Sequence, residues 1–206
     1  MKSHADTVSL VAAALMLGAC ASNAPAPRPV VHTQIQQDES GFALLDTVRV
    51  GSDARADYDS AIRLLTQGQS GEGIALLQKL AQTVPDVTAP HVDLGIAYAR
   101  AGDLDKAEAS LKRALELSPG HPVAHNELGI VYRRKGEFAA ARASYEQALA
   151  TYPGFHFARL NLAILCDLYL ADPACALDHY AAYQQAVPDD KQAAMWIADL
   201  RARAQK

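Results

Sequence analysis

The spacing of prolines is the feature that most constrains how this chain can fold. Pro85, Pro119, Pro153 and Pro188 are separated by 34, 34 and 35 residues. A fixed period of this length indicates stacked supersecondary units, each of which leaves an apolar face that its neighbours must cover. The chain is therefore expected to be a repeat protein whose core extends along a stack of small units.

Two copies of the repeat match each other position by position. The leucine and the tyrosine of each copy, four residues apart, share one helix face. The glycine after the leucine lets a second helix approach closely, where Ala107 or Ala141 is expected to meet it. A later glycine and the final proline end the two helices. The matching positions are Leu94, Gly95, Tyr98, Gly102, Ala107, Leu111, Ala114, Leu115 and Pro119 in the first copy, and Leu128, Gly129, Tyr132, Gly136, Ala141, Tyr145, Ala148, Leu149 and Pro153 in the second.

These residues resemble the tetratricopeptide repeat, whose pattern is Leu-Gly, Tyr, spaced small and aromatic residues, and Pro. The resemblance implies an all-α fold, a right-handed α-solenoid of antiparallel helix hairpins with three to four repeats. The two outer repeats are degenerate, and residues 189–206 are predicted to form the capping helix that an open stack needs. Within residues 54–188, the repeats are assigned to 54–87, 88–121, 122–155 and 156–188.

Residues 1–19 resemble a bacterial lipoprotein signal peptide. Val8–Leu17 is almost entirely apolar but shorter than the roughly 20 residues that a membrane span needs. The run ends in Leu17-Gly18-Ala19-Cys20, which resembles a lipobox and implies cleavage before Cys20 and acylation of that residue. Because Ala21 follows the cysteine, analogy with Gram-negative sorting predicts a lipid anchor on the periplasmic face of the outer membrane. The alternative is a plain secretory signal that is cut near Ala21 or Ala24.

The segment 20–53 is predicted to be a flexible tether. Every second residue of Ala24–Pro29 is proline, a pattern that favours an extended polyproline conformation. His32–Ser40 is polar, and such a segment cannot bury enough apolar surface to offset the cost of ordering. The apolar run Phe42–Val50 is the exception, expected either to dock on the repeats or to bind a partner.

Cys166 and Cys175 lie on either side of the predicted turn in the fourth repeat. The turn should bring them opposite each other, and a periplasmic protein lives in an oxidising compartment. We therefore predict a disulfide, with two buried free thiols as the alternative. Metal binding is not favoured, because no paired ligands surround them.

No catalytic constellation is evident in the sequence. It lacks a Gly-x-Ser-x-Gly elbow and a phosphate-cradling glycine-rich loop. His121 is expected in a loop and His125 at a packing position, so the chain is predicted to be no enzyme and to need no metal or cofactor. The net charge of −4 offers no basic surplus for phosphates, which argues against nucleic acid as a partner.

In the family that the chain resembles, the first helices line a concave groove that holds a segment of a partner protein. The isoleucines are expected to form an aliphatic stripe with arginines beside it. The predicted partner segment is amphipathic or extended, apolar on one side and acidic on the other. Alternatively, residues 42–50 or a second copy of the chain in a homodimer cover the stripe. The groove positions are Val92, Ile96, Arg100, Asn126, Ile130, Arg133, Arg134, Leu160 and Ile164.

Three roles are compatible with this reading. The first is a scaffold that helps to assemble a multiprotein envelope machine, such as a pilus, a secretion system or a TonB-type system. The second is an adaptor for a periplasmic protease or a cell-wall enzyme. The third is a structural spacer with no groove ligand. The sequence leaves the identity of the protein partner open, because one fold hosts many partners.

Overall fold

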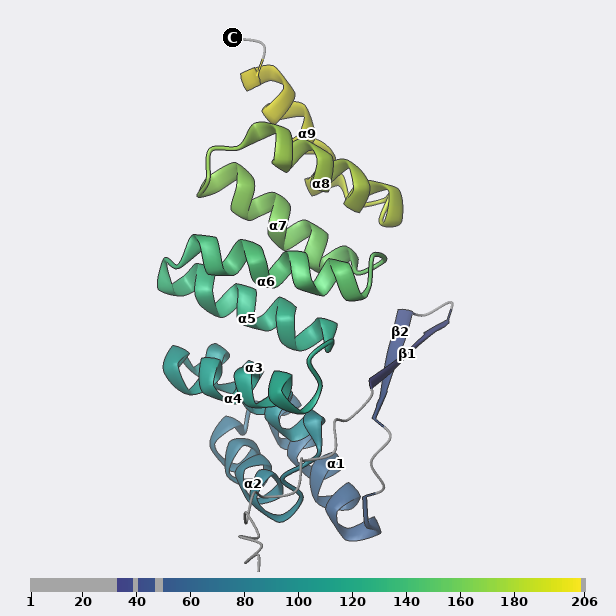
Figure 1. The fold of residues 1–206 in the computed structure, drawn as a ribbon, viewed down its shortest axis with the longest axis vertical. Helices are drawn as coiled ribbons and strands as arrows, with labels where there is room; N and C mark the ends of the chain where they lie inside the picture. Colours follow the sequence, from purple (N-terminus) through teal and green to yellow (C-terminus); the bar gives the residue numbers. More distant parts are fainter. Residues whose placement is uncertain (1–32, 39–40, 47–49, 205–206) are drawn as a thin grey trace, which may run out of the picture.

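The computed structural model describes residues 33–38, 41–46 and 50–204. Cys20 and the predicted signal peptide lie outside the described residues. The described chain from residue 52 onward folds into helices that stack as successive hairpins into an elongated body (Figure 1). This confirms the predicted all-α repeat fold. The helices are α1 Ser52–Thr66, α2 Ser70–Thr83, α3 Thr88–Ala101, α4 Leu104–Leu117, α5 Pro122–Lys135, α6 Phe138–Thr151, α7 His156–Leu168, α8 Pro173–Ala186 and α9 Lys191–Ala204.

Residues 33–46 differ from the flexible tether expected for 20–53. They contain an antiparallel hairpin of β1 (Thr33–Asp38) and β2 (Gly41–Asp46), with Ile35 opposite Leu44. Only Glu39 and Ser40 separate the strands in sequence, a length typical of hairpins. Two paired strands satisfy each other's backbone groups locally, which the low hydrophobicity of the segment did not reveal. The hairpin therefore lies within the segment 20–53 that is predicted to be a tether.

The turns inside the repeats follow the predicted glycine chemistry. Gly102 and Gly136 have φ angles of 88° and 81°, in the left-handed region that glycine adopts without strain. The next residue along then donates its N–H back across the helix end, from Asp103 to Tyr98 at 3.0 Å and from Glu137 to the carbonyl of residue 132 at 2.9 Å. This is the Schellman arrangement, and it ends the first helix of a hairpin at a fixed residue.

Close packing within each hairpin depends on a glycine, as predicted, but against different neighbours. A Cβ atom added at Gly129 would lie 2.5 Å from Cε1 of Tyr145, and one at Gly95 would overlap the side chain of Leu111. The large side chains on the second helices, rather than the alanines expected there, therefore fill the space above the glycines. Tyr145 and Leu111 are fully buried as a result.

The last repeat is closed by a disulfide and a terminal helix. Cys166 on α7 and Cys175 on α8 are joined, with Sγ atoms 2.03 Å apart and Cα atoms 5.9 Å apart. Ile197 and Leu200 of α9 are buried in a core cluster formed by α6 to α9, which we call the second core cluster. Helix α9 thus covers the apolar face that α8 would otherwise expose. In the described part of the chain, no helix is both long and apolar enough to cross a bilayer.

Candidate protein-binding groove

The first helices of consecutive repeats form one continuous surface. Helix α3 contacts α5, and α5 contacts α7, although a second helix separates each pair in sequence. On the other side of the stack, an open pocket of about 310 Å³ separates α2 from α4 and is lined by Gln78 of α2, Tyr98 of α3 and Lys106 of α4, among others. Because the first helices approach one another and these second helices diverge, the stack curves with the first helices on its inner side.

Three side chains recur at equal offsets on the two central first helices. The second and third lie three and seven residues after the first. This places all three within about 60° of one another around the helix axis, with the second and third about 4.5 and 10.5 Å along the axis from the first. Each helix therefore presents a carboxylate, an isoleucine and a guanidinium in order along one face. The residues are Asp93, Ile96 and Arg100 on α3, and Glu127, Ile130 and Arg134 on α5.

The isoleucines continue beyond these two helices and form what we call the isoleucine row. The predicted stripe contained three members, and the structure adds Ile62 on α1 at the same 34-residue offset. The alignment of the repeats could have found Ile62, but the degenerate first repeat lacks the Leu-Gly pair that marks the register. Every member is half-buried: Ile62, Ile96, Ile130 and Ile164.

The carboxylates form an acidic row that the sequence analysis missed. Oδ2 of Asp93 accepts a hydrogen bond from the hydroxyl of Tyr58 at 2.5 Å, and Oε1 of Glu127 accepts one from Nδ2 of Asn126 at 3.1 Å. Burial raises the pKa of both carboxyl groups, opposed by these hydrogen bonds and by the charge of Arg100. Neither forms an ion pair with any side chain in the described part of the chain.

The three predicted groove arginines have different surroundings. Nη1 of Arg134 donates to the carbonyl oxygen of Ala99 at the end of α3. The guanidinium of Arg133 lies 5.8 Å from the ring centroid of Tyr169 and 3.5 Å from its hydroxyl. Arg100 is exposed. Two of the arginines thus also join neighbouring repeats, which the count of positive charges did not predict.

Two other predicted groove residues belong to the interior. Val92 is 5% exposed and lies in the first core cluster, which the buried apolar residues of α1 to α5 form. Asn126 is 3% exposed, and its Oδ1 accepts a hydrogen bond from Nδ2 of Asn161 at 2.9 Å. The structure therefore assigns Val92 to packing and Asn126 to the link between α5 and α7. Leu160 is half-buried against the second core cluster.

Helix α7 ends the groove with an apolar face. Phe157 and Leu168 are 54% and 66% exposed, unusually high for large apolar side chains. They share a helix face with Leu160 and Ile164, at spacings of three, four and four residues. Neither Phe157 nor Leu168 was predicted as a groove residue, although the repeat register places Leu168 at the offset of Arg100 and Arg134.

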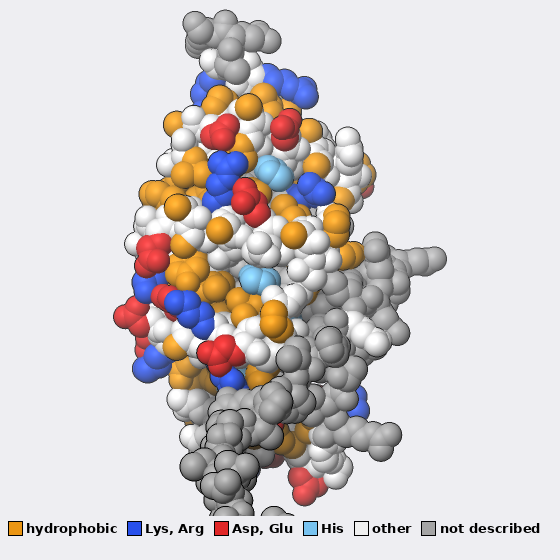
Figure 2. Space-filling view, viewed as in Figure 1, with side chains coloured by type: hydrophobic (Ala, Val, Ile, Leu, Met, Phe, Trp, Pro, Cys, Tyr) orange, Lys and Arg blue, Asp and Glu red, His pale blue; other side chains and the backbone are white. Residues whose placement is uncertain are grey.

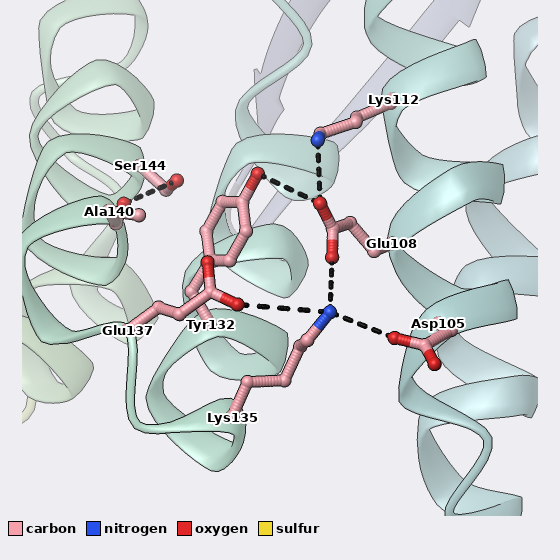
Figure 3. Close-up of polar contacts among 8 residues, drawn as sticks. All are labelled: Asp105, Glu108, Lys112, Tyr132, Lys135, Glu137, Ala140 and Ser144. Atoms are coloured by element: carbon pink, nitrogen blue, oxygen red, sulfur yellow. Dashed lines mark hydrogen bonds and ion pairs between the residues drawn. The ribbon is translucent and has the colours of Figure 1, made fainter.

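The outer side of the stack is held by charge contacts between repeats (Figure 3). The carboxylate of Glu108 on α4 lies 2.6 Å from Nζ of Lys112 and 2.7 Å from Nζ of Lys135 on α5. Lys135 also contacts Asp105 at 2.9 Å and Glu137 at 3.8 Å. Hydrogen bonds from the two lysines lower the pKa of Glu108 to about 2.

Figure 2 shows a face on which acidic and basic side chains alternate among apolar ones, so no single-sign field covers it.

The histidines considered in the sequence have structural contacts. Nδ1 of His121 accepts the N–H of Ala124 at 3.1 Å and so caps α5. Nε2 of His125 faces the carbonyl oxygen of Pro119 at 2.8 Å. Arg159 occupies the equivalent position one repeat later, and its Nη2 donates to the carbonyl of Pro153 at 2.8 Å. These side chains tie each first helix to the end of the preceding repeat.

Cys166, Asp172 and Cys175 form a cluster of metal-ligating residue types, with ligand atoms within 4.8 Å of one another. The two sulfur atoms are bonded to each other, which removes the thiolates that a soft metal would require. The carboxylate of Asp172 accepts the N–H of Cys175 at 3.1 Å and caps α8. The arrangement therefore closes a hairpin.

Helix hairpins stacked so that their first helices line one curved face define an α-solenoid. The sequence profile of the tetratricopeptide repeat family matches residues 86–154, which span α3 to α6. The family match is confined to this segment, and α1, α2, α7 and α8 continue the same hairpin arrangement on either side. A search of curated protein sequences finds no significant match.

Solved structures show the same fold. A tetratricopeptide repeat protein of Thermus thermophilus is 27% identical with a TM-score of 0.63, over 73% of this chain and 82% of that one. PilF of Pseudomonas aeruginosa is 18% identical with a TM-score of 0.68, over 74% and 69%. The first repeat domain of Spaghetti (RPAP3), in complex with an HSP90 peptide, is 18% identical with a TM-score of 0.55, over 58% and 94%.

Proposed function

We propose that this chain is a non-catalytic protein-interaction scaffold of the bacterial envelope, which binds a segment of a partner protein along its inner face. The isoleucine row is the observation that carries the proposal. Four aliphatic side chains at one offset lie half-buried along the inner face, and Ile96, Ile130 and Ile164 pack against the edges of the core clusters. Contiguous apolar surface rimmed by charged groups marks an interaction site in soluble proteins.

The location in the envelope is proposed from the sequence before residue 33. The apolar run and the Leu17–Cys20 motif support a lipid anchor on Cys20. A disulfide between Cys166 and Cys175 suits an oxidising compartment such as the periplasm. Two or three acyl chains hold a protein on a membrane stably, whereas one chain holds it only marginally. Ala21 directs the anchored protein to the outer membrane in this proposal.

Assembly of a multiprotein envelope machine is the role that we favour. A solenoid offers a long surface for a partner segment rather than a pocket for a small substrate. PilF shares the fold alone at 18% identity. An adaptor for a periplasmic protease or cell-wall enzyme would differ from an assembly factor in the identity of the protein that it captures. A structural spacer would capture no protein.

The test is site-specific photo-crosslinking in cells that produce the full-length chain. A photoreactive residue at position 100 should yield one dominant crosslinked protein. The double variant Ile96→Ser and Ile130→Ser should lose most of that product, because it removes the centre of the apolar surface. Met195→Ser is the matched control, since Met195 is 67% exposed on α9 away from the groove. Equal crosslinking by all three chains, with melting temperatures unchanged, would refute the groove.

A further inference from the structure

The three rows of the groove differ in charge across its width. Each of α3 and α5 has its carboxylate nearer the N-terminal end, its isoleucine in the middle and its arginine nearer the C-terminal end. Because α3 and α5 lie side by side and run in the same direction along the stack, equal offsets line up between them. One edge of the groove is therefore acidic and the other basic, with the isoleucine row between them. Asp59 on α1 extends the acidic row by one more repeat.

We propose that the occupant of this groove is an amphipathic α-helix of another protein, with basic residues on one flank and acidic residues on the other. This inference rests on the proposed function and specifies its partner. The apolar face of the helix would lie on the isoleucine row. Its basic flank would meet Asp93 and Glu127, and its acidic flank would meet Arg100 and Arg134. This replaces the purely acidic flank expected from the arginines alone.

The number of rows favours a helix over an extended segment. An extended chain points alternate side chains to two opposite faces, so it can offer a groove only one row. A helix turns by about 100° per residue and presents an apolar face with a polar row on each side. Neighbouring packed helices lie about 8–10 Å apart, which is close to the roughly 10.8 Å rise of two helical turns. Residues seven apart in the partner would therefore meet successive isoleucines.

The burial and the hydrogen bonds of the Asp93 and Glu127 carboxylates support a cationic flank of the partner helix opposite them. Asp93 and Glu127 are half-buried, and their hydrogen-bond donors are the neutral hydroxyl of Tyr58 and the neutral amide of Asn126. Burial raises the pKa of both carboxyl groups, although the hydrogen bonds and the charge of Arg100 oppose that rise. A lysine or arginine of the partner would compensate it, because an opposite charge within about 4–6 Å favours the ionised form.

The charges also fix the direction of the bound helix. Reversing the helix in the groove exchanges its flanks, which sets basic residues against Arg100 and acidic residues against Glu127. Like charges placed together at an interface cost affinity and suppress the wrong arrangement. The opposite edges of the groove therefore select one of the two orientations that an apolar stripe alone would accept.

The experiment uses the full-length chain and four synthetic helical peptides of about 18 residues, enough to cross three repeats. All four carry the same leucine row. Their flanks are Lys on one side and Glu on the other, Lys on both, Glu on both, or Gln on both. Fluorescence anisotropy should show the Lys/Glu peptide binding about tenfold tighter than each of the others, an advantage that shrinks in high salt because exposed charges are screened.

Charge reversal in the chain provides the matched test. Arg100→Glu removes part of the basic row without touching the core, and should reduce the preference for the Lys/Glu peptide over the Lys/Lys peptide by about fivefold. Arg201→Glu reverses a charge that is also exposed, on α9, and should leave the preference unchanged. Equal affinity of all four peptides, lost together in the Ile96→Ser and Ile130→Ser chain, would overturn the charged flanks while leaving the groove intact.

The remaining outcomes separate this inference from the proposed function. If no peptide binds but the isoleucine variants still lose the cellular crosslink, the helical partner is wrong and the groove stands. If no peptide binds and the crosslink is also unaffected, both proposals fail. Binding that appears only after deletion of residues 41–50, or only to a monomer separated from a dimer, would assign the groove to the chain itself and overturn the inference.

Discussion

The contact between α4 and α5 allows a quantitative test of how the repeats are held together. The carboxylate of Glu108 lies within hydrogen-bonding distance of Lys112 and Lys135, and the hydroxyl of Tyr132 donates to it at 3.4 Å. Lys135 and Tyr132 belong to the following repeat, so this carboxylate joins two repeats. Glu108→Gln keeps the shape of the side chain and removes its charge, which isolates the electrostatic contribution.

The magnitude follows from the pKa of Glu108. A fall from 4.5 to about 2 corresponds to roughly 3.4 kcal/mol of stabilisation, as an upper limit. The side chain of Glu108 is 17% exposed but that of Lys112 is 54% exposed, so water screens part of the attraction. Exposed pairs contribute about 0.2–1 kcal/mol each and hydrogen bonds to charged groups somewhat more. We expect Glu108→Gln to lower the free energy of unfolding by about 1–2 kcal/mol at pH 7.

The pH dependence carries the sign of the effect. Because the pKa of Glu108 is lower in the folded state, its contribution is fully present above pH 4.5 and is lost as the pH falls from 4.5 to about 2. Urea unfolding followed by circular dichroism measures the difference between the parent chain and Glu108→Gln across this range. Glu137→Gln is the control, since that carboxylate is exposed and 3.8 Å from Lys135.

Two results would contradict this reasoning. The first is a destabilisation at pH 7 no larger for Glu108→Gln than for Glu137→Gln. The second is a difference between the parent chain and Glu108→Gln that persists unchanged at pH 2. Either result would mean that the lysines do not hold the repeats together through this carboxylate, and that apolar packing alone determines the interface.

Three further predictions concern packing, cross-linking and location. Gly129→Ala should destabilise the chain by about 1–3 kcal/mol, because a Cβ would overlap the ring of its neighbour on α6, whereas Gly71→Ala, with open space around it, should stabilise by about 0.5–1 kcal/mol in thermal unfolding. Replacing Cys166 and Cys175 together by Ser should lower the free energy of unfolding by about 2–3 kcal/mol. Reducing the parent chain should lower it by the same amount, whereas adding reductant to the variant should cause no further loss. Cys20→Ser should move the protein from the membrane to the soluble fraction and abolish labelling by an alkyne fatty acid; retention on the membrane would refute lipidation of that residue.

The helices and turns were predictable because they depend on residues close together in sequence. The position of Gly102 or Gly136 sets where a first helix ends, whatever the rest of the stack does. The disulfide could be predicted for the same reason, since its two cysteines flank one short turn. The hairpin at residues 33–46 was not predicted, because each strand is short and its pairing leaves little trace in hydrophobicity.

The groove was only partly predictable because its polar contacts cross between repeats. The hydrogen bonds from Tyr58 to Asp93 and from Asn161 to Asn126 each join residues 35 apart. One repeat read by itself does not show which side chains meet in this way, so Arg134 was taken for a partner contact although it also holds the end of α3. The acidic row could have been found by extending the 34-residue alignment to Asp93 and Glu127.

The same cross-repeat hydrogen bonds link the shape of the groove to its binding surface. Each bond joins one first helix to the next, so together they set how closely the first helices approach and therefore how sharply the stack curves. A substitution at Asn126 or Tyr58 would change the curvature as well as the surface, and a loss of binding would have two explanations. The isoleucines and Arg100 take no part in these bonds. They are therefore the residues through which partner binding can be tested without breaking the hydrogen bonds that set the curvature of the groove.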